Sequence, residues 1–250
     1  ILKKDWAFDG VVVSDWGGTH NTNEAALYGL DIEMGSPIDK QTSPRQAFEA
    51  NFFGTSFLNL LKSGEIDERI LDDKVRRILR LMMRTTLDFM RPLGKINNIE
   101  HSMVARQVAI EGVVLLKNKD NFFPLNTTQK LTIAVIGENA VKSMTTGGGS
   151  SELKANYEIS PLEGIQKRFK NASIIFSKGY TSEDTNQSRK SLINEALVTA
   201  SMADVVLFFG GLNKNRGQDC EAADREELKL PYNQDYLIAE LQKVKPNIGV

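Results

Sequence analysis

The run GVVVSDWGG at positions 10–18 is the most informative stretch of this sequence for its fold class. Its three consecutive valines, Val11, Val12 and Val13, are β-branched and apolar, which is typical of a short parallel strand buried on both faces. A polar, glycine-rich loop follows and carries Asp15 and Trp16. In α/β barrels the active site forms at the carboxyl ends of the strands. The run therefore places Asp15 where a catalytic carboxylate of such a fold would lie.

Two interpretations of Asp15 stand side by side. As a catalytic residue it would lie next to Trp16, whose indole would provide an apolar wall or a stacking surface for a sugar. As a purely structural residue it would cap the helix that follows, a position where aspartate is common.

The region around this loop indicates alternating strands and helices. A second short strand is expected at residues 30–34. Apolar residues at helical spacing predict a helix over residues 46–62 and another that opens near Asp67. Two strands followed by long helices fit the end of an α/β barrel or a doubly wound sheet. The second helix is expected to bury a stripe formed by Ile70, Leu71, Val75, Ile78, Leu79 and Met82.

The segment between residues 91 and 101 is rich in Pro, Gly and Asn and is the best candidate for a linker. A second α/β region follows, and the alternation of its elements predicts a largely parallel sheet. One of its helices has a clear start at Ser160-Pro161, with Glu163 completing a capping box. The expected strands are 113–116, 132–137, 173–176 and 205–210, and the expected helices are 103–112, 188–200 and 233–243.

Composition excludes several classes of protein. The 250 residues carry 31 Lys+Arg and 32 Asp+Glu, a net charge of −1, so a broad electrostatic nucleic-acid binder is excluded. The mean hydropathy is −0.29, and no apolar run approaches the roughly 18 residues of a membrane span. The only cysteine is Cys220, and the two histidines, His20 and His101, are far apart. These counts argue against a disulfide, a CxxC site and a histidine-based zinc site, and no metal is expected.

An acidic loop after the strand at 205–210 holds a second set of candidate residues. Glu221 and Asp219 are close in sequence, and crowded carboxylates raise the pKa of one of them, as a general acid requires. The alternative is a solvated surface loop in which Asp224 and Arg225 pair. The glycines at 147–149 match neither GxxxxGK[ST] nor GxGxxG, so no nucleotide cofactor is expected.

The two ends of the chain suggest a piece of a longer protein. The first residue is Ile1 rather than Met, with no signal segment, and the last residues begin an apolar strand.

Several colinear motifs resemble glycoside hydrolase family 3, the family of β-glucosidases and β-xylosidases. The segment around Asp15 resembles the family's nucleophile segment, and the resemblance covers nearly the whole chain. The matching segments are DGVVVSDWG at 9–17, ALYGLDIEM at 26–34, VRRIL at 75–79, ARQVA at 105–109, VLLKN at 114–118, GGGS at 147–150, SPLEG at 160–164, EAADR at 221–225, Leu230-Pro231 and Gln234.

The resemblance implies a (β/α)8 barrel followed by an α/β sandwich domain, both truncated here. Residues 1–92 would be the C-terminal part of the catalytic barrel, 93–101 the linker, and 102–250 the sandwich domain, incomplete at its C-terminus. The earlier barrel strands, which hold the sugar hydroxyls in the family, would precede Ile1.

The resemblance also implies roles for particular residues. Asp15 would be the nucleophile and Glu221 the acid/base. Because the family often reads Glu-Gly-x-Asp-Arg where this chain reads Glu-Ala-Ala-Asp-Arg, Asp219 is the alternative acid/base. Trp16 would line the site of the non-reducing sugar, and Ser150 and Gly149 would border the cleft.

The implied function is a retaining, exo-acting β-glycosidase, in the first place a β-glucosidase, that hydrolyses terminal β-D-glycosyl residues of oligosaccharides through a covalent glycosyl-enzyme, without a cofactor. The alternatives are a β-xylosidase and a non-catalytic carbohydrate-binding paralogue. The 250-residue chain alone is expected to be inactive on aryl glucosides, because positioning groups carry much of the rate. The partner is a glycoside substrate, with no nucleic acid or membrane partner; the sequence does not predict the oligomeric state. Exported relatives favour a periplasmic or secreted location.

Overall fold

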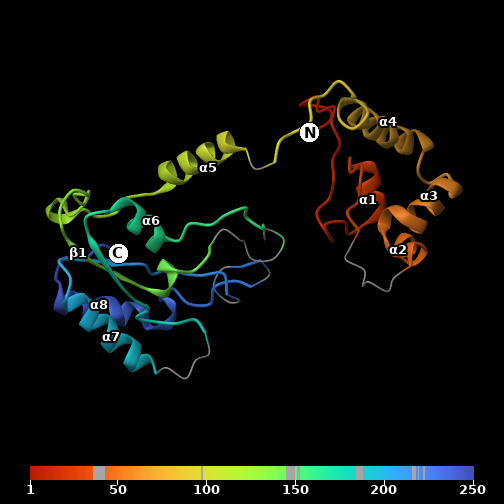
Figure 1. Cartoon of the computed structure of the whole chain (residues 1–250). Coiled ribbons are helices and arrows are strands. Elements are labelled where there is room, and N and C mark those ends of the chain that lie inside the picture. The colour runs from red at the N-terminus through yellow and green to blue at the C-terminus, as the bar shows by residue number, and fades with distance from the viewer. Residues whose placement is uncertain are drawn as a thin grey trace. The chain divides into compact units, whose positions relative to one another are not determined.

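The computed structural model divides the chain into two compact units, Ile1–Ile96 and Asn97–Val250. Figure 1 shows the first unit in red and orange and the second mainly in green and blue. The structure describes residues 1–35, 43–96, 98–144, 150, 153–183, 188–215, 218, 220–221 and 223–250.

The first unit is mainly helical. Its helices are α1 (Thr22–Leu27), α2 (Pro44–Ala50), α3 (Phe57–Ser63) and α4 (Glu68–Arg84). Polar residues cap three of them: the side chains of Asn21, Ser43 and Asp67 each accept a backbone N–H of the first turn. Asp67 confirms the helix start expected from the sequence.

The helix predicted over residues 46–62 is two helices. A π-helical turn, η1 (Phe52–Ser56), separates α2 from α3. Within it Gly54 has φ −90° and ψ −127°, and a Cβ there would lie 1.6 Å from the carbonyl oxygen of Phe48. The chain folds back so closely that only glycine fits, so the helix breaks although the apolar spacing continues.

The core of the first unit is small. Ala26, Phe57 and Ile66 are buried, and the rings of Phe53 and Phe57 stack with their centroids 5.0 Å apart. Ile70 and Leu71 pack against this core as expected. The remaining residues of the predicted stripe of α4 are not all buried. Val75, Leu79 and Met82 are exposed, because no described element of this unit covers them, so the prediction is wrong for these three residues.

The two strands predicted near the start of the chain are shorter than expected. The runs at 11–13 and 30–34 meet in a single parallel bridge between Val13 and Ile32. Backbone bonds extend the contact, since Ser14 N–H donates to the Ile32 carbonyl at 3.0 Å and Asp31 N–H to the Val12 carbonyl at 2.9 Å. Val13 is exposed rather than buried on both faces.

The second unit contains the parallel sheet that the sequence predicts. Its described strands are β1 (Thr132–Ile136), β2 (Ser173–Ser177) and β3 (Val205–Phe208), in the order β2-β1-β3. Both pairings are parallel, with Ala134 opposite Ile175 and Val206. A further parallel bridge joins Leu207 to Gly249 on the far side of β3. The α/β class and the mostly parallel sheet are confirmed.

Helices cover both faces of this sheet. Figure 1 shows α7 (Arg189–Ser201) and α8 (Gln234–Val244) on one face and α6 (Pro161–Arg168) on the other. The core is accordingly two clusters, one around Ile136, Val206 and Leu237 and one around Ile133 and Val135. Alternate strand residues therefore supply opposite faces of the sheet. The capping box at Ser160 and Glu163 is present as predicted.

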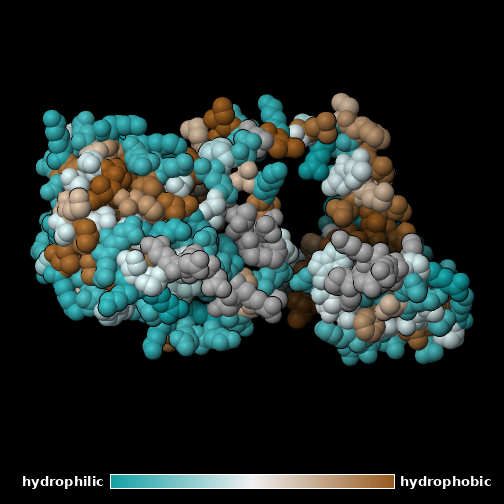
Figure 2. Space-filling model, turned by 60° about the horizontal axis from the view of Figure 1, so that its bottom comes forward, coloured by the Kyte–Doolittle hydropathy of each residue, from teal (hydrophilic) through white to brown (hydrophobic). Residues whose placement is uncertain are grey.

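An apolar segment lies near the start of the second unit. Helix α5 (Ile99–Gly112) begins inside the expected linker, and Val113, Val114, Leu115 and Leu116 follow it. These four side chains are exposed, and they form no strand, so the strand predicted there is wrong: no described neighbour pairs with their backbone. Apolar side chains reach the surface of both units in Figure 2. None of the helices in the described ranges is long and apolar enough to cross a bilayer.

Candidate active site

The loop that carries Asp15 is exposed and folded on itself. Asp15 Oδ1 accepts the backbone N–H of Trp16 at 2.7 Å, and the Asp15 carbonyl accepts that of Gly18 at 3.0 Å. Gly17 has φ +67°, in the left-handed region that favours glycine. Trp16 is 60 % exposed. Both the carboxylate of Asp15 and the indole of Trp16 are therefore accessible to solvent.

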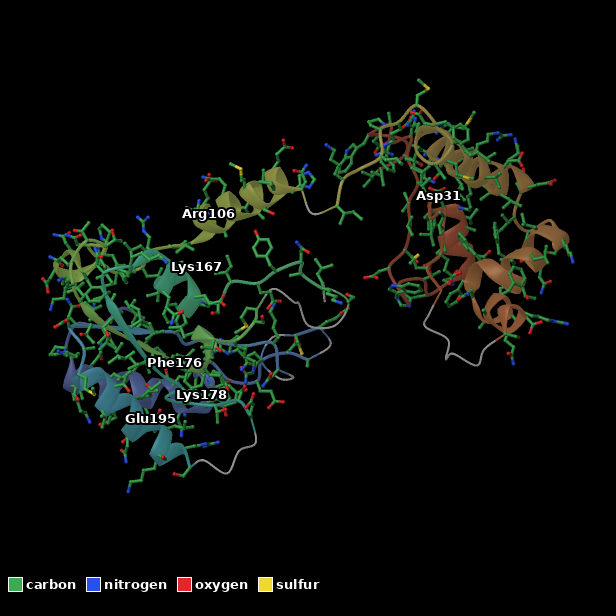
Figure 3. All side chains as sticks on the ribbon, viewed as in Figure 1. Asp31, Arg106, Lys167, Phe176, Lys178 and Glu195 are labelled. Carbon is green, nitrogen blue, oxygen red and sulfur yellow. The ribbon has the colours of Figure 1, made fainter. Side chains whose placement is uncertain are left out.

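A buried carboxylate anchors the chain just before this loop. Asp31, labelled in Figure 3, has a side chain with no exposed surface. Its Oδ1 lies 2.6 Å from the ammonium of Lys3, and its Oδ2 accepts the Val12 backbone N–H at 2.8 Å. Each oxygen of the carboxylate therefore has a donor, as a buried charge requires. Asp31 fixes the segment that leads to Asp15.

Two further polar contacts hold the neighbouring segment. Ser14 Oγ accepts the backbone N–H of Met34 at 2.9 Å. The Glu33 carboxylate accepts the N–H groups of Phe52 and Phe53 at 3.2 and 2.6 Å, at the start of the η1 turn. Together they tie the residues on either side of the Asp15 loop to the helical part of the unit.

Sequence reasoning did not identify Lys3 and Asp31 as a site-supporting pair. The available signal was a single acidic residue inside the otherwise apolar run Leu30, Asp31, Ile32, which predicts a buried and therefore partnered charge. Its partner could not be predicted, because Lys3 lies 28 residues away in the chain.

The second carboxylate lies in the second unit, in the loop that follows β3. Glu221 is exposed and stands in a tight turn closed by Cys220 and Ala223, whose backbones bond to each other. Its Oε1 accepts the Ser150 hydroxyl at 2.9 Å, and its Oε2 accepts the Ser150 backbone N–H. The structure thus brings together two predicted site residues, Glu221 and Ser150.

This contact has an electrostatic consequence. Hydrogen bonds from the backbone N–H and then the hydroxyl of Ser150 lower the pKa of Glu221, because both favour the charged carboxylate. The sequence interpretation expected crowding to raise a pKa in this loop. For Glu221 the direction is the opposite, a lowered pKa, because its carboxylate faces two hydrogen-bond donors; the other carboxylate of that prediction, Asp219, lies outside the described residues.

The remaining candidates are placed as follows. Gly149 and Asp219 lie outside the described residues. Arg225 donates to the backbone carbonyls of Glu227, Leu228 and Lys229. Among the residues that the structure describes, no group of three or more His, Cys, Asp or Glu side chains could hold a metal ion.

The α/β fold and the two exposed carboxylates, Asp15 and Glu221, are consistent with a glycoside hydrolase. An α/β chain that displays two carboxylates on separate loops carries the residue types with which most glycoside hydrolases act.

The chain belongs to glycosyl hydrolase family 3. The model of the glycosyl hydrolase family 3 C-terminal domain matches residues 113–250.

Relatives extend the similarity to the first unit. The chain is 40 % identical over 263 aligned residues to β-glucosidase BoGH3A of Bacteroides ovatus, an alignment that covers 99 % of this chain and 35 % of that protein. It is 34 % identical to thermostable β-glucosidase B of Acetivibrio thermocellus, over 100 % of this chain and 31 % of the relative. Among solved structures, a family 3 β-glucosidase of Bifidobacterium adolescentis matches with a TM-score of 0.78 and 29 % identity, over 99 % of this chain and 33 % of the other. The chain thus spans about a third of the length of these relatives.

Proposed function

We propose that this chain carries the two catalytic carboxylates of a retaining, exo-acting β-glucosidase. The observation that carries the proposal is the 40 % identity to a β-glucosidase across 99 % of the chain, which includes both carboxylate loops. The geometry supports it, because Asp15 and Glu221 are both exposed and both held by hydrogen bonds at their loops.

We assign residues 1–92 to the end of a (β/α)8 barrel, 93–101 to a linker and 102–250 to the α/β sandwich domain. The parallel bridge between Val13 and Ile32, with helix α1 between them, supports the first assignment, since strand, helix and parallel strand form the repeating unit of that barrel. The three-stranded parallel sheet supports the last.

In the proposed reaction Asp15 is the nucleophile. Its carboxylate attacks the anomeric carbon, and the bond from that carbon to the glycosidic oxygen breaks as a covalent glycosyl-enzyme forms. An exposed carboxylate in a loop that follows a short strand suits this role, because it is accessible to a substrate.

Glu221 supplies the proton in the first step and removes one in the second. It protonates the departing glycosidic oxygen, and its carboxylate then takes a proton from the water that hydrolyses the intermediate. A retaining mechanism requires the two carboxyl groups to stand about 5–5.5 Å apart. The two donors of Ser150 stabilise the form that Glu221 needs in the second step, when it acts as a base.

The substrate in this proposal is a β-glucoside or an oligosaccharide with a terminal glucose. Trp16 offers 60 % of its surface to solvent beside Asp15, which suits stacking against the apolar face of a sugar ring. We also propose that Ser150, whose hydroxyl contacts Glu221, takes part in substrate binding. Gly149 is assigned to the same role from the family resemblance alone.

The test uses the full-length protein and aryl β-glucosides. Asp15→Asn should lower kcat by several orders of magnitude, and Asp72→Asn, which alters an exposed aspartate of the same unit, should leave it unchanged. NMR of the first product should show β-glucose before mutarotation. Release of α-glucose would contradict a retaining mechanism, and faster cleavage of aryl xylosides than of glucosides would contradict the assigned sugar.

A further inference from the structure

Two tyrosines stack beneath the loop that carries Glu221. The rings of Tyr180 and Tyr232 lie nearly parallel, with an interplanar angle of 5° and centroids 6.1 Å apart. Tyr180 is buried at 3 % exposure, and its hydroxyl donates to the Phe209 carbonyl at 2.8 Å and accepts the Asn139 backbone N–H at 3.2 Å. The pair therefore joins the carboxyl end of β1 to the end of β3, where the loop begins.

The hydroxyl of Tyr232 contacts several side chains in the middle of this loop. Its oxygen lies within hydrogen-bond distance of the side-chain amides of Asn213 (3.4 Å), Asn215 (3.3 Å) and Gln218. Asn213 is 4 % exposed, and its backbone N–H donates to Gln218 Oε1 at 3.2 Å. One phenol thus contacts three loop side chains in the stretch that ends at Glu221.

The root of the loop is held from two other elements. Gln234, the first residue of α8, is fully buried, and its side-chain amide both accepts from the Gly211 N–H at 2.7 Å and donates to the Gly211 carbonyl at 3.0 Å. Asn139 Nδ2 contacts the carbonyl of Gly210 at 3.2 Å. Because the root is fixed, the contacts of Tyr232 determine where the next residues of the loop lie.

The backbone conformation at Tyr232 is energetically unfavourable for a tyrosine. Tyr232 and Asn233 both have φ +59°, a left-handed conformation that tyrosine rarely adopts. Such residues persist only when the surrounding structure determines them, and they concentrate at functional sites.

We propose that Tyr232 is a positioning residue for the acid/base Glu221: its ring stacks on Tyr180, and its hydroxyl holds Asn213, Asn215 and Gln218 so that Glu221 reaches the departing glycosidic oxygen. The inference rests on the proposed function and adds to it a residue that does not contact the substrate. Its effect is therefore confined to the steps in which Glu221 moves a proton.

The test is Tyr232→Phe in the full-length protein, which removes only the hydroxyl. Cleavage of a phenyl β-glucoside requires protonation of the phenolate, a poor leaving group. From a 2,4-dinitrophenyl β-glucoside, the dinitrophenolate leaves without being protonated. We expect kcat/KM for the phenyl substrate to fall about 10-fold and that for the dinitrophenyl substrate to fall less than about twofold. Tyr236→Phe, the same substitution at an exposed tyrosine of α8, should change neither.

Equal losses on both substrates would mean that the hydroxyl only stabilises the fold and would overturn the proposal, as would no change on either. Gln218→Ala serves as a second variant if Tyr232→Phe does not fold, and it should show the same selective loss on the phenyl substrate. The variant Glu221→Gln separates a failure of the proposed function from a failure of the role assigned to Tyr232. If the loss of kcat/KM in Glu221→Gln does not depend on the leaving group, the assigned role of Glu221 fails. If that loss does depend on the leaving group, but neither Tyr232→Phe nor Gln218→Ala shows the same dependence, only the role of Tyr232 fails.

Discussion

Replacing Asp31 with Asn should loosen the segment that carries Asp15. The substitution keeps an oxygen for the Val12 N–H but removes the charge that faces the Lys3 ammonium at 2.6 Å. Charged hydrogen bonds contribute about 1.5–3 kcal/mol each, and Lys3 keeps 18 % of its side chain in solvent, so we expect a loss of about 2–3 kcal/mol in local stability. At 1.36 kcal/mol per factor of ten, amide exchange should accelerate roughly 30- to 150-fold.

The assay is hydrogen–deuterium exchange of the full-length protein, read in a peptide that spans residues 10–18. Lys3→Met should accelerate exchange more than Asp31→Asn, because it leaves a carboxylate with no exposed surface and one backbone donor. Asp72→Asn, at an exposed pair with Arg76, is the matched control and should leave the peptide unchanged. Unchanged exchange in Asp31→Asn, or a smaller effect of Lys3→Met, would show that the Asp31–Lys3 pair does not hold this segment.

Three further predictions address the second unit. Ser150→Ala removes a hydroxyl that lowers the pKa of Glu221, so the alkaline limb of the kcat/KM profile should move to higher pH; a move to lower pH would contradict the contact. Gly137→Ala places a Cβ 2.1 Å from a backbone carbonyl at φ +125° and should cost more than about 2 kcal/mol by urea unfolding, whereas Gly112→Ala, with nothing within 4 Å, should cost little. Burial raises the pKa of Tyr180 to about 12, so only the unfolded state ionises this phenol between about pH 10 and 12. Stability should fall with rising pH across that window, and fall less in Tyr180→Phe.

Much of the second unit could be predicted from local patterns. The apolar strands at β1 and β3 and the capping box at Ser160 follow from period, β-branching and cap chemistry, and the structure confirms them. The break at Gly54 could not be predicted, because it depends on the approach of the Phe48 carbonyl rather than on hydrophobic spacing.

The candidate site, too, could be predicted only in part from the sequence. Asp15 and Glu221 could be proposed from loops that follow strands, and their catalytic roles stay predictions. The groups that hold them could not be proposed, because these groups come from distant parts of the chain. Asp31 holds the Asp15 segment through the Val12 N–H and is paired with Lys3, 28 residues away. Tyr232 contacts Gln218, 14 residues away, from a left-handed backbone that local propensity disfavours.

Trapping of the glycosyl-enzyme identifies the nucleophile, which we expect to be Asp15. The full-length protein should be inactivated by 2,4-dinitrophenyl 2-deoxy-2-fluoro-β-glucoside, and its intact mass should rise by one fluoroglucosyl group. Peptide mass spectrometry should place that group on Asp15. A label on another carboxylate, or normal turnover of glucosides by the Asp15→Asn variant, would contradict the assignment of Asp15 as the nucleophile.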